Sequence, residues 1–152
     1  MNKNEVVEKL KLLSENIGVP LKEFYLTAGG ALLFLGLRDS VADADISVTP
    51  KVMDKILSLG FKQNESIYPG VRWVNYDVYD IMDNATPEME RESIYYSSYG
   101  ISTVSIYELY KLKQTLSQIR NKQKDTDDIV NLTKIISKTQ KGRDWLKENT
   151  LK

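Results

Sequence analysis

The stretch EFYLTAGGALLFLGLRDSVADADISV, residues 23–48, decides the fold of this chain. It begins with a short aromatic, β-prone segment, passes through Gly29 and Gly30 into an almost uniformly apolar segment, and ends where apolar and polar residues alternate. This order predicts a strand, a glycine turn, a short buried helix and a second strand. Two carboxylates, Asp43 and Asp45, stand at the start of the second strand.

Further helices and strands are predicted on both sides of this stretch. Before it, apolar residues recur at helical spacing up to Gly18, which is a typical helix end. After it, the dipeptide Thr49–Pro50 combines an N-cap with a residue suited to the first helical turn, and Gly60 ends that helix. Later strands are expected over residues 61–63 and 71–81.

The last third of the chain is expected to be helical. Ser105 and Glu108 have the spacing of a capping box ahead of a helix. We therefore predict a single domain of the α/β or α+β class. In this domain a small mixed β-sheet with helices packed on it occupies residues 1–104, and C-terminal helices occupy residues 105–152.

The composition limits the chemistry that is available. Lysine plus arginine and aspartate plus glutamate both number 21, so no net charge draws the chain to nucleic acids or membranes, and general DNA binding is not expected. Cysteine and histidine are absent, which excludes thiol nucleophiles, histidine bases and zinc sites built from these residues. Any reaction would rely on carboxylates, hydroxyls, lysine and arginine.

No membrane segment is expected. The longest apolar run, Ala31–Leu37, is far too short to cross a bilayer, and the charged, amphipathic start lacks the apolar core of a signal peptide. We therefore expect no membrane partner and a cytoplasmic location.

The two carboxylates of the quoted stretch are expected on one side of a strand. Asp43 and Asp45 are two residues apart, so their side chains project together, while Ala44 and Ile46 face the opposite way. Such close carboxylates repel each other unless a cation lies between them, and Mg²⁺ prefers oxygen ligands of this kind. A strand end in solvent, where two aspartates are harmless, explains the pair as well.

Two more features suit a phosphate ligand and a metal. A Gly29–Gly30 turn ahead of a helix presents bare backbone amides to phosphate oxygens, although a glycine pair is also common in ordinary turns. In the segment WVNYDVYD, the alternation of side chains predicts that Asp77 points from one face of a later strand. Three strand carboxylates with a phosphate-binding turn are typical of metal-assisted phosphoryl or nucleotidyl transfer.

These residues resemble the signature of the nucleotidyltransferase superfamily, in which a Gly-Gly or Gly-Ser turn is followed by an Asp-x-Asp pair with apolar flanks. Gly29–Gly30, Asp43 and Asp45 fit this pattern, and Asp77 fits the third carboxylate. Ala44 departs from it, because the family usually has a bulkier aliphatic residue at this position.

Two further segments are similar to small minimal nucleotidyltransferases, a group that includes antibiotic nucleotidyltransferases and toxin-type relatives. Arg38, Asp39 and Ser40, just before the Asp-x-Asp pair, match their Arg-Asp-Ser/Thr form. The C-terminal segment resembles a pattern in which an acidic-Leu-x-x-x-Lys helix precedes Lys-Asp-x-x-Asp-Ile. That match singles out Lys113, Lys124, Asp125 and Asp128.

The resemblance implies a metal-dependent nucleotidyltransferase that binds ATP or another nucleoside triphosphate. Such an enzyme transfers a nucleoside monophosphate to an acceptor hydroxyl of a small molecule, a protein or a tRNA end, and releases pyrophosphate. Asp43 and Asp45 would bind Mg²⁺, normally in a two-metal site, with Asp77 as the third ligand or the base. The nucleotide contacts implied by the resemblance are Gly29, Gly30, Arg38, Ser40 and Lys113.

Simpler roles stay open for the residues outside the Asp-x-Asp and glycine motifs. Arg38 could pair with its neighbour on a surface loop, and Lys113 could be solvated. Lys124, Asp125 and Asp128 could form a helix cap and a surface ion pair.

Two other functions are also compatible with the sequence. The chain could be a binding or regulatory protein that keeps the fold without turnover, for example in a toxin–antitoxin or defence system. It could also be a structural domain whose acidic residues coincide by chance. The presence of Asp43, Asp45 and Asp77 favours an enzyme, because a degenerate relative would be expected to lose at least one of them.

Overall fold

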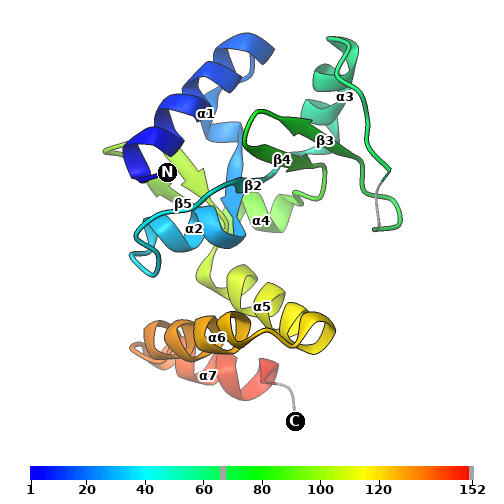
Figure 1. Cartoon of the computed structure of the whole chain (residues 1–152). Helices are drawn as coiled ribbons and strands as arrows, with labels where there is room; N and C mark the ends of the chain where they lie inside the picture. Colours follow the sequence, from blue (N-terminus) through cyan, green and yellow to red (C-terminus); the bar gives the residue numbers. More distant parts are fainter. Residues whose placement is uncertain (66–67, 151–152) are drawn as a thin grey trace. The chain divides into compact units, whose positions relative to one another are not determined.

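The computed structural model describes residues 1–65 and 68–150. They form a mixed α/β structure, which confirms the predicted fold class. The chain divides into two compact units, Met1–Val104 and Ser105–Lys152, and each is described here by itself (Figure 1). The β-sheet belongs to the first unit, and the second unit is helical.

Within residues 1–65 and 68–104, six strands form one mixed sheet. Their order across the sheet is β3-β4-β2-β1-β6-β5. The pairs β2–β4 and β1–β6 are parallel, and the other neighbours are antiparallel. The strands are β1 (Tyr25–Thr27), β2 (Ala44–Ser47), β3 (Trp73–Tyr76), β4 (Tyr79–Met82), β5 (Ile94–Tyr96) and β6 (Ile101–Thr103).

The helices of the first unit are α1 (Lys3–Ile17), α2 (Ala28–Phe34), α3 (Pro50–Ser58) and α4 (Pro87–Glu92), with a 3-10 turn at Leu21–Glu23. Local sequence signals mark the end of α1 at Gly18 and the start of α3 at Thr49, as predicted. α1 begins with a capping box between Asn2 and Glu5 and ends at Gly18, whose φ of 74° is left-handed. α3 is capped by Thr49, whose hydroxyl accepts a hydrogen bond from the Val52 amide at 3.3 Å.

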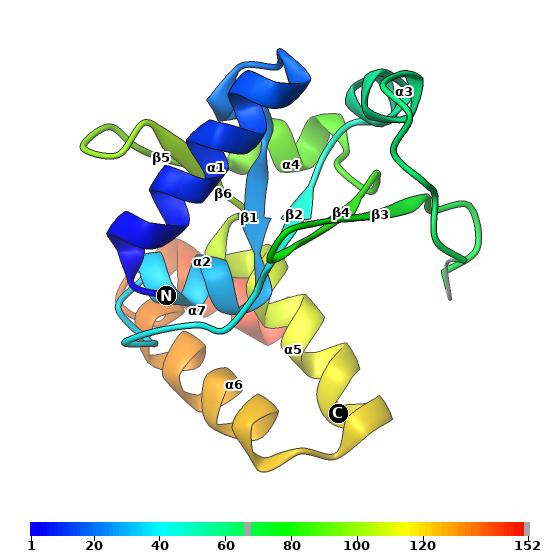
Figure 2. The same cartoon turned by 45° about the horizontal axis from the view of Figure 1, so that its top comes forward.

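The core lies between one face of the sheet and the helices α1, α2 and α3, and α1 packs against this face (Figure 2). Leu26, Ile46 and Ile81 point to this face from three neighbouring strands and are fully buried. Tyr79 is also buried there, and its hydroxyl donates a hydrogen bond to the carbonyl of Val6 in α1 at 2.7 Å. Because side chains alternate along each strand, the residues between these positions project from the opposite face.

The junction between β1 and α2 differs from the predicted glycine turn. Gly29 and Gly30 lie inside the first turn of α2, and the chain changes direction at Ala28, whose φ of 49° is in the left-handed region. Gly30 is buried, and a Cβ atom there would lie 3.3 Å from Leu26 Cδ2 and 3.4 Å from Ala44 Cβ. Gly30 therefore allows α2 to pack closely on β1 and β2.

The prediction that Asp77 projects from a strand is wrong. β3 ends at Tyr76 and β4 begins at Tyr79, and these two residues pair directly, so Asp77 and Val78 form the hairpin turn between them. Asp77 has a φ of 52°, a conformation that aspartate adopts more readily than most residues. The alternation of side chains therefore restarts after the turn, and Asp80 becomes the strand carboxylate.

The strand predicted over residues 61–63 is also wrong, since the structure has none there. The next residue, Asn64, forms an isolated bridge in which its amide donates to the carbonyl of Trp73 at 2.8 Å. Lys62 and Gln63 are exposed, so this segment buries little of the apolar surface that would stabilise a strand.

The second unit consists of two long antiparallel helices and a shorter third one. They are α5 (Ile106–Arg120), α6 (Gln123–Ile136) and α7 (Gln140–Asn149). Ser105 caps α5 as predicted, because its hydroxyl accepts a hydrogen bond from the Glu108 amide at 3.2 Å. The rings of Tyr107 and Tyr110 pack against Trp145 and join α5 to α7. In the described ranges of both units, no helix has the length and apolar character needed to cross a membrane.

Gly30→Val should destabilise the first unit, because the added side chain overpacks the contact with Leu26 and Ala44. We expect the free energy of unfolding, measured by chemical denaturation, to fall by about 2 kcal/mol. Gly29→Ala is the control: its Cβ would lie 3.5 Å from Val41 Cγ1, an ordinary contact, so stability should not fall. Equal losses in the two variants would contradict the packing role of Gly30.

Candidate functional site

A row of polar side chains crosses the sheet on the face opposite the core. Asp45 of β2 is the register partner of Asp80 of β4 on one side and of Thr27 of β1 on the other. Asn75 of β3 pairs with Asp80 and continues the row. Asp45 and Asp80, called the register pair below, therefore lie side by side on parallel strands, with backbones roughly 4.8 Å apart.

The acidic side of β2 is matched by an apolar side. Asp43 immediately precedes the strand and is exposed, and Asp45 is half-buried. Ala44 and Ile46 are 3% and 0% exposed, so their predicted burial on the opposite side is confirmed.

The start of α2 lies next to the register pair. β1 ends at Thr27, the strand partner of Asp45, and Thr27 is also the N-cap residue of α2. The first helical turn, which contains Gly29 and Gly30, follows directly, and its backbone amides have no partners within the helix. The amides can donate hydrogen bonds to phosphate oxygens, and the neighbouring carboxylates can bind a cation.

Asp80 is the candidate residue that the sequence analysis missed. Its Oδ1 atom accepts hydrogen bonds from Asn75 Nδ2 and from Trp73 Nε1, the latter at 3.3 Å. Its Oδ2 atom has no hydrogen-bond partner among the residues that the structure describes. The signal that points to Asp80 is the dipeptide Asp77–Val78, because aspartate is a common turn residue and a turn there moves the strand carboxylate to a later position.

The register pair suits a divalent cation that arrives together with a ligand. In the described part of the chain, no three acidic, histidine or cysteine side chains lie close enough together to form a ready-made metal site. Mg²⁺ does not need one, since proteins usually bind it through one or two carboxylates together with waters and substrate phosphates. Asp45 and Asp80, with Asp43 at the start of the strand, are oxygen ligands of the required type.

Asp77 makes its contacts elsewhere. Its carboxylate lies 3.0 Å from Lys9 Nζ of α1, and its side chain is 49% exposed. Because α1 packs on the core face of the sheet, this ion pair draws Asp77 toward that face, whereas the register pair projects from the other. The structure thus groups Asp80, and not Asp77, with Asp45.

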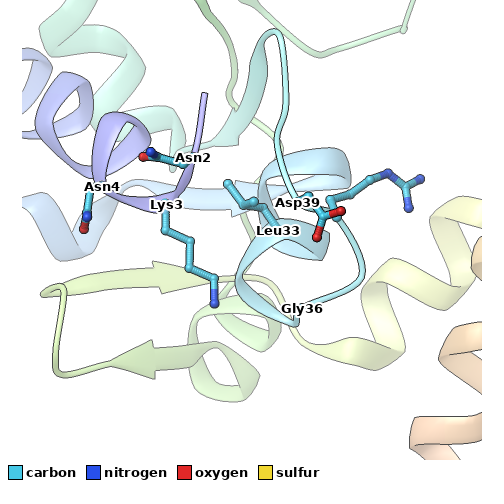
Figure 3. A pocket seen from close by; sticks show the side chains of 7 residues that line it. Asn2, Lys3, Asn4, Leu33, Gly36 and Asp39 are labelled. Carbon is cyan, nitrogen blue, oxygen red and sulfur yellow. The ribbon is translucent and has the colours of Figure 1, made fainter.

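Arg38 and Ser40 lie in the segment between α2 and β2. Arg38 donates a hydrogen bond from Nη1 to the carbonyl of Leu37 at 3.0 Å, and Ser40 is exposed. Arg38 also lines a pocket of about 380 Å³ between this segment and the start of α1 (Figure 3). The register pair is not part of its lining, which otherwise consists of Asn2, Lys3, Asn4, Leu33, Gly36 and Asp39.

Lys113 is buried in the second unit together with two aspartates. Its Nζ atom lies 3.3 Å from Asp125 Oδ1 and 3.0 Å from Asp128 Oδ2, and all three side chains are almost completely buried. Arg120 adds a second cation, 2.7 Å from Asp125 Oδ1. These four residues form a charge-balanced cluster between α5 and α6, so the interpretations of Lys113 as solvated and of the aspartates as a surface ion pair are wrong.

The buried cluster has a structural role in the second unit. Burial alone raises the pKa of Asp125, but hydrogen bonds from Arg120 and Lys113 outweigh it and hold this pKa below its ordinary value. Asp125 therefore contributes stability above about pH 4 that is lost as the pH falls through its lowered pKa. Lys122, and not Asp125, is the N-cap of α6, and Lys124 is exposed.

Comparison with known proteins does not place the chain in a family. No protein-family model matches the chain, and neither the curated proteins nor the solved structures give a match.

Lys113→Met should lower the free energy of unfolding by about 3 kcal/mol, because it removes the lysine partner of two buried carboxylates. In an Asp128→Asn background the same replacement should cost about 1 kcal/mol less, since fewer buried charges are left unpaired. Chemical denaturation of the single and double variants measures both effects. Lys124→Met, at an exposed position of α6, is the control and should change stability by less than about 0.5 kcal/mol. If the stability losses of Lys113→Met and Asp128→Asn simply add in the double variant, the two side chains do not interact, which would contradict the buried cluster.

Proposed function

We propose that the first unit binds a nucleoside triphosphate with Mg²⁺ and transfers its nucleoside monophosphate to an acceptor hydroxyl. The observation that carries this proposal is the register pair. Asp45 and Asp80 lie side by side on parallel strands, and Thr27, from which α2 begins, lies directly beside Asp45. Carboxylates for a cation and amides for phosphates are thus adjacent, and the motifs resemble those of nucleotidyltransferases.

Each part of the site has a role in this proposal. Asp45 and Asp80 bind Mg²⁺, and Asp43 supplies a further carboxylate for the same or a second ion. The backbone amides of the first turn of α2 bind phosphate oxygens. Asp80 takes the role of third carboxylate that the sequence analysis assigned to Asp77.

Of the other nucleotide contacts that the resemblance implies, the proposal keeps two and drops one. Arg38 and Ser40 stay in the proposal as phosphate contacts, because their segment leads directly into Asp43. Lys113 does not, since its ammonium group is buried between two aspartates of its own unit.

The proposed reaction is a displacement at the α-phosphorus. The acceptor oxygen forms a bond to that phosphorus, the bond to the bridging oxygen breaks, and pyrophosphate leaves with the electron pair. Mg²⁺, when bound, stabilises the negative charge on the phosphate oxygens. A carboxylate of the site accepts the proton of the acceptor hydroxyl, a role that histidine cannot fill because the chain contains none. The acceptor is a small molecule, a protein or a tRNA end.

A second candidate is a protein that binds the nucleotide without turnover. The observation in its favour is that, across residues 1–65 and 68–150, no three acidic side chains are gathered into one metal site. Such a protein would bind the complex of Mg²⁺ and nucleotide but release no pyrophosphate, so the two candidates differ in a measurable product.

Calorimetric titration with ATP, GTP, CTP and UTP, each with and without Mg²⁺, tests the proposal. The wild type should bind at least one of them in the presence of Mg²⁺. Asp45→Asn and Asp80→Asn should each weaken that binding by about tenfold or more, because each removes a metal ligand. Asp77→Asn is the matched control: it should bind like the wild type and lose at most about 1 kcal/mol of stability with its exposed ion pair to Lys9.

The alternatives give different results in the same titration. Failure of the wild type to bind any triphosphate would overturn the proposal. Loss of binding in Asp77→Asn with no loss in Asp80→Asn would return the role of third carboxylate to Asp77. Binding without release of pyrophosphate, whichever class of acceptor is supplied, would favour the second candidate.

A further inference from the structure

The hydrogen bonds of Asp80 belong to a chain that reaches the edge of the sheet. Asn64 Nδ2 donates to Asn75 Oδ1, and Asn75 Nδ2 donates in turn to Asp80 Oδ1. Trp73 Nε1 donates to the same oxygen atom at 3.3 Å. Both donors to the carboxylate therefore contact Oδ1, and Oδ2 has no hydrogen-bond partner in the described residues.

The backbone fixes the positions of all three donors. Asn75 is the direct strand partner of Asp80. Trp73 lies two residues before Asn75 on β3, and so on the same face of the sheet. Asn64 is attached to β3 through the hydrogen bond from its amide to the Trp73 carbonyl at 2.8 Å. A carboxylate that accepts hydrogen bonds from donors on rigid strands keeps one orientation.

Stability alone does not explain this arrangement. Asn75 is exposed and Asp80 is only half-buried, and hydrogen bonds between solvated polar groups contribute little net stability. An ionised carboxylate has about four acceptor positions on its two oxygens, yet both donors here contact Oδ1. Oδ2 is thereby left available to a further ligand.

We propose that Asn64, Asn75 and Trp73 are positioning residues, which orient Asp80 so that its Oδ2 atom is presented to the divalent cation shared with Asp45. This inference rests on the proposed function of the register pair and extends it to residues that do not touch the cation. Hydrogen-bond partners of metal-ligating carboxylates typically account for roughly 10- to 100-fold in metal affinity.

Mn²⁺ binding by the full chain, followed by electron paramagnetic resonance of the free ion, tests the positioning role. Titrations with Mn²⁺ alone and with Mn²⁺ plus ATP are compared. Asn75→Ala removes one donor to Asp80, and Trp73→Phe removes the other while keeping an aromatic ring, so each should weaken Mn²⁺ affinity by roughly tenfold. Asn64→Ala removes the outer donor and should have a smaller effect in the same direction.

Two controls separate positioning from a structural effect. Asn84→Ala changes an exposed asparagine that follows β4 and should bind Mn²⁺ like the wild type. Asn75→Ala/Asp80→Asn should bind Mn²⁺ no more weakly than Asp80→Asn alone, because Asn75 acts only through Asp80.

The outcomes distinguish this inference from the proposed function. If the wild type binds Mn²⁺ and both Asn75→Ala and Trp73→Phe bind it equally well, the positioning role is overturned and the proposed function stands. A loss of affinity in Asn75→Ala that persists in the Asp80→Asn background also overturns it. If the wild type binds no Mn²⁺ under either condition, the inference and the proposed function are both overturned.

Discussion

The parallel pairing of β2 with β4 is the constraint on which the candidate site depends. Ile46 and Ile81 are register partners and are both fully buried, so packing in the core determines this alignment. Since side chains alternate along a strand, the same alignment places Asp45 beside Asp80 on the other face. A shift of one residue would turn Asp80 into the core and remove the pair. Hydrophobic packing on one face of the sheet therefore determines the acidic geometry on the other.

The buried cluster of the second unit and the register pair of the first unit differ in what neutralises their carboxylates. In the second unit, Lys113 and Arg120 supply the cations for two buried carboxylates, so that cluster is complete within the fold. Asp80, by contrast, receives its hydrogen bonds, within the part of the chain that the structure describes, from the neutral groups of Asn75 and Trp73. These donors orient its carboxylate without cancelling the negative charge, which a divalent cation can then bind. The buried cluster of the second unit contributes stability, and the carboxylate of Asp80 keeps a negative charge that a ligand can bind.

The parts of the fold that local signals determine could be predicted from the sequence. Apolar patterning and glycine placed β1, α2 and β2 in the correct order, and Thr49 marked the start of α3. Asp80 was missed because Asp77–Val78 continues the strand-like alternation, which outweighed the turn preference of aspartate; the pairing of Tyr76 with Tyr79 shows the turn. The burial of Lys113 was equally hidden, since it depends on how α5 packs against α6 rather than on the residues around it.

The central claim is that Asp45 and Asp80 share a divalent cation, and nuclear magnetic resonance of the ¹⁵N-labelled chain titrated with Mn²⁺ and ATP tests it most directly. Paramagnetic broadening decreases steeply with distance, so the first signals to disappear identify the residues around the ion. We predict that these are the amides of Asp45, Asp80 and the first turn of α2. Early broadening around Asp77 and Lys9, with the signals of Asp45 and Asp80 unaffected, would contradict the claim.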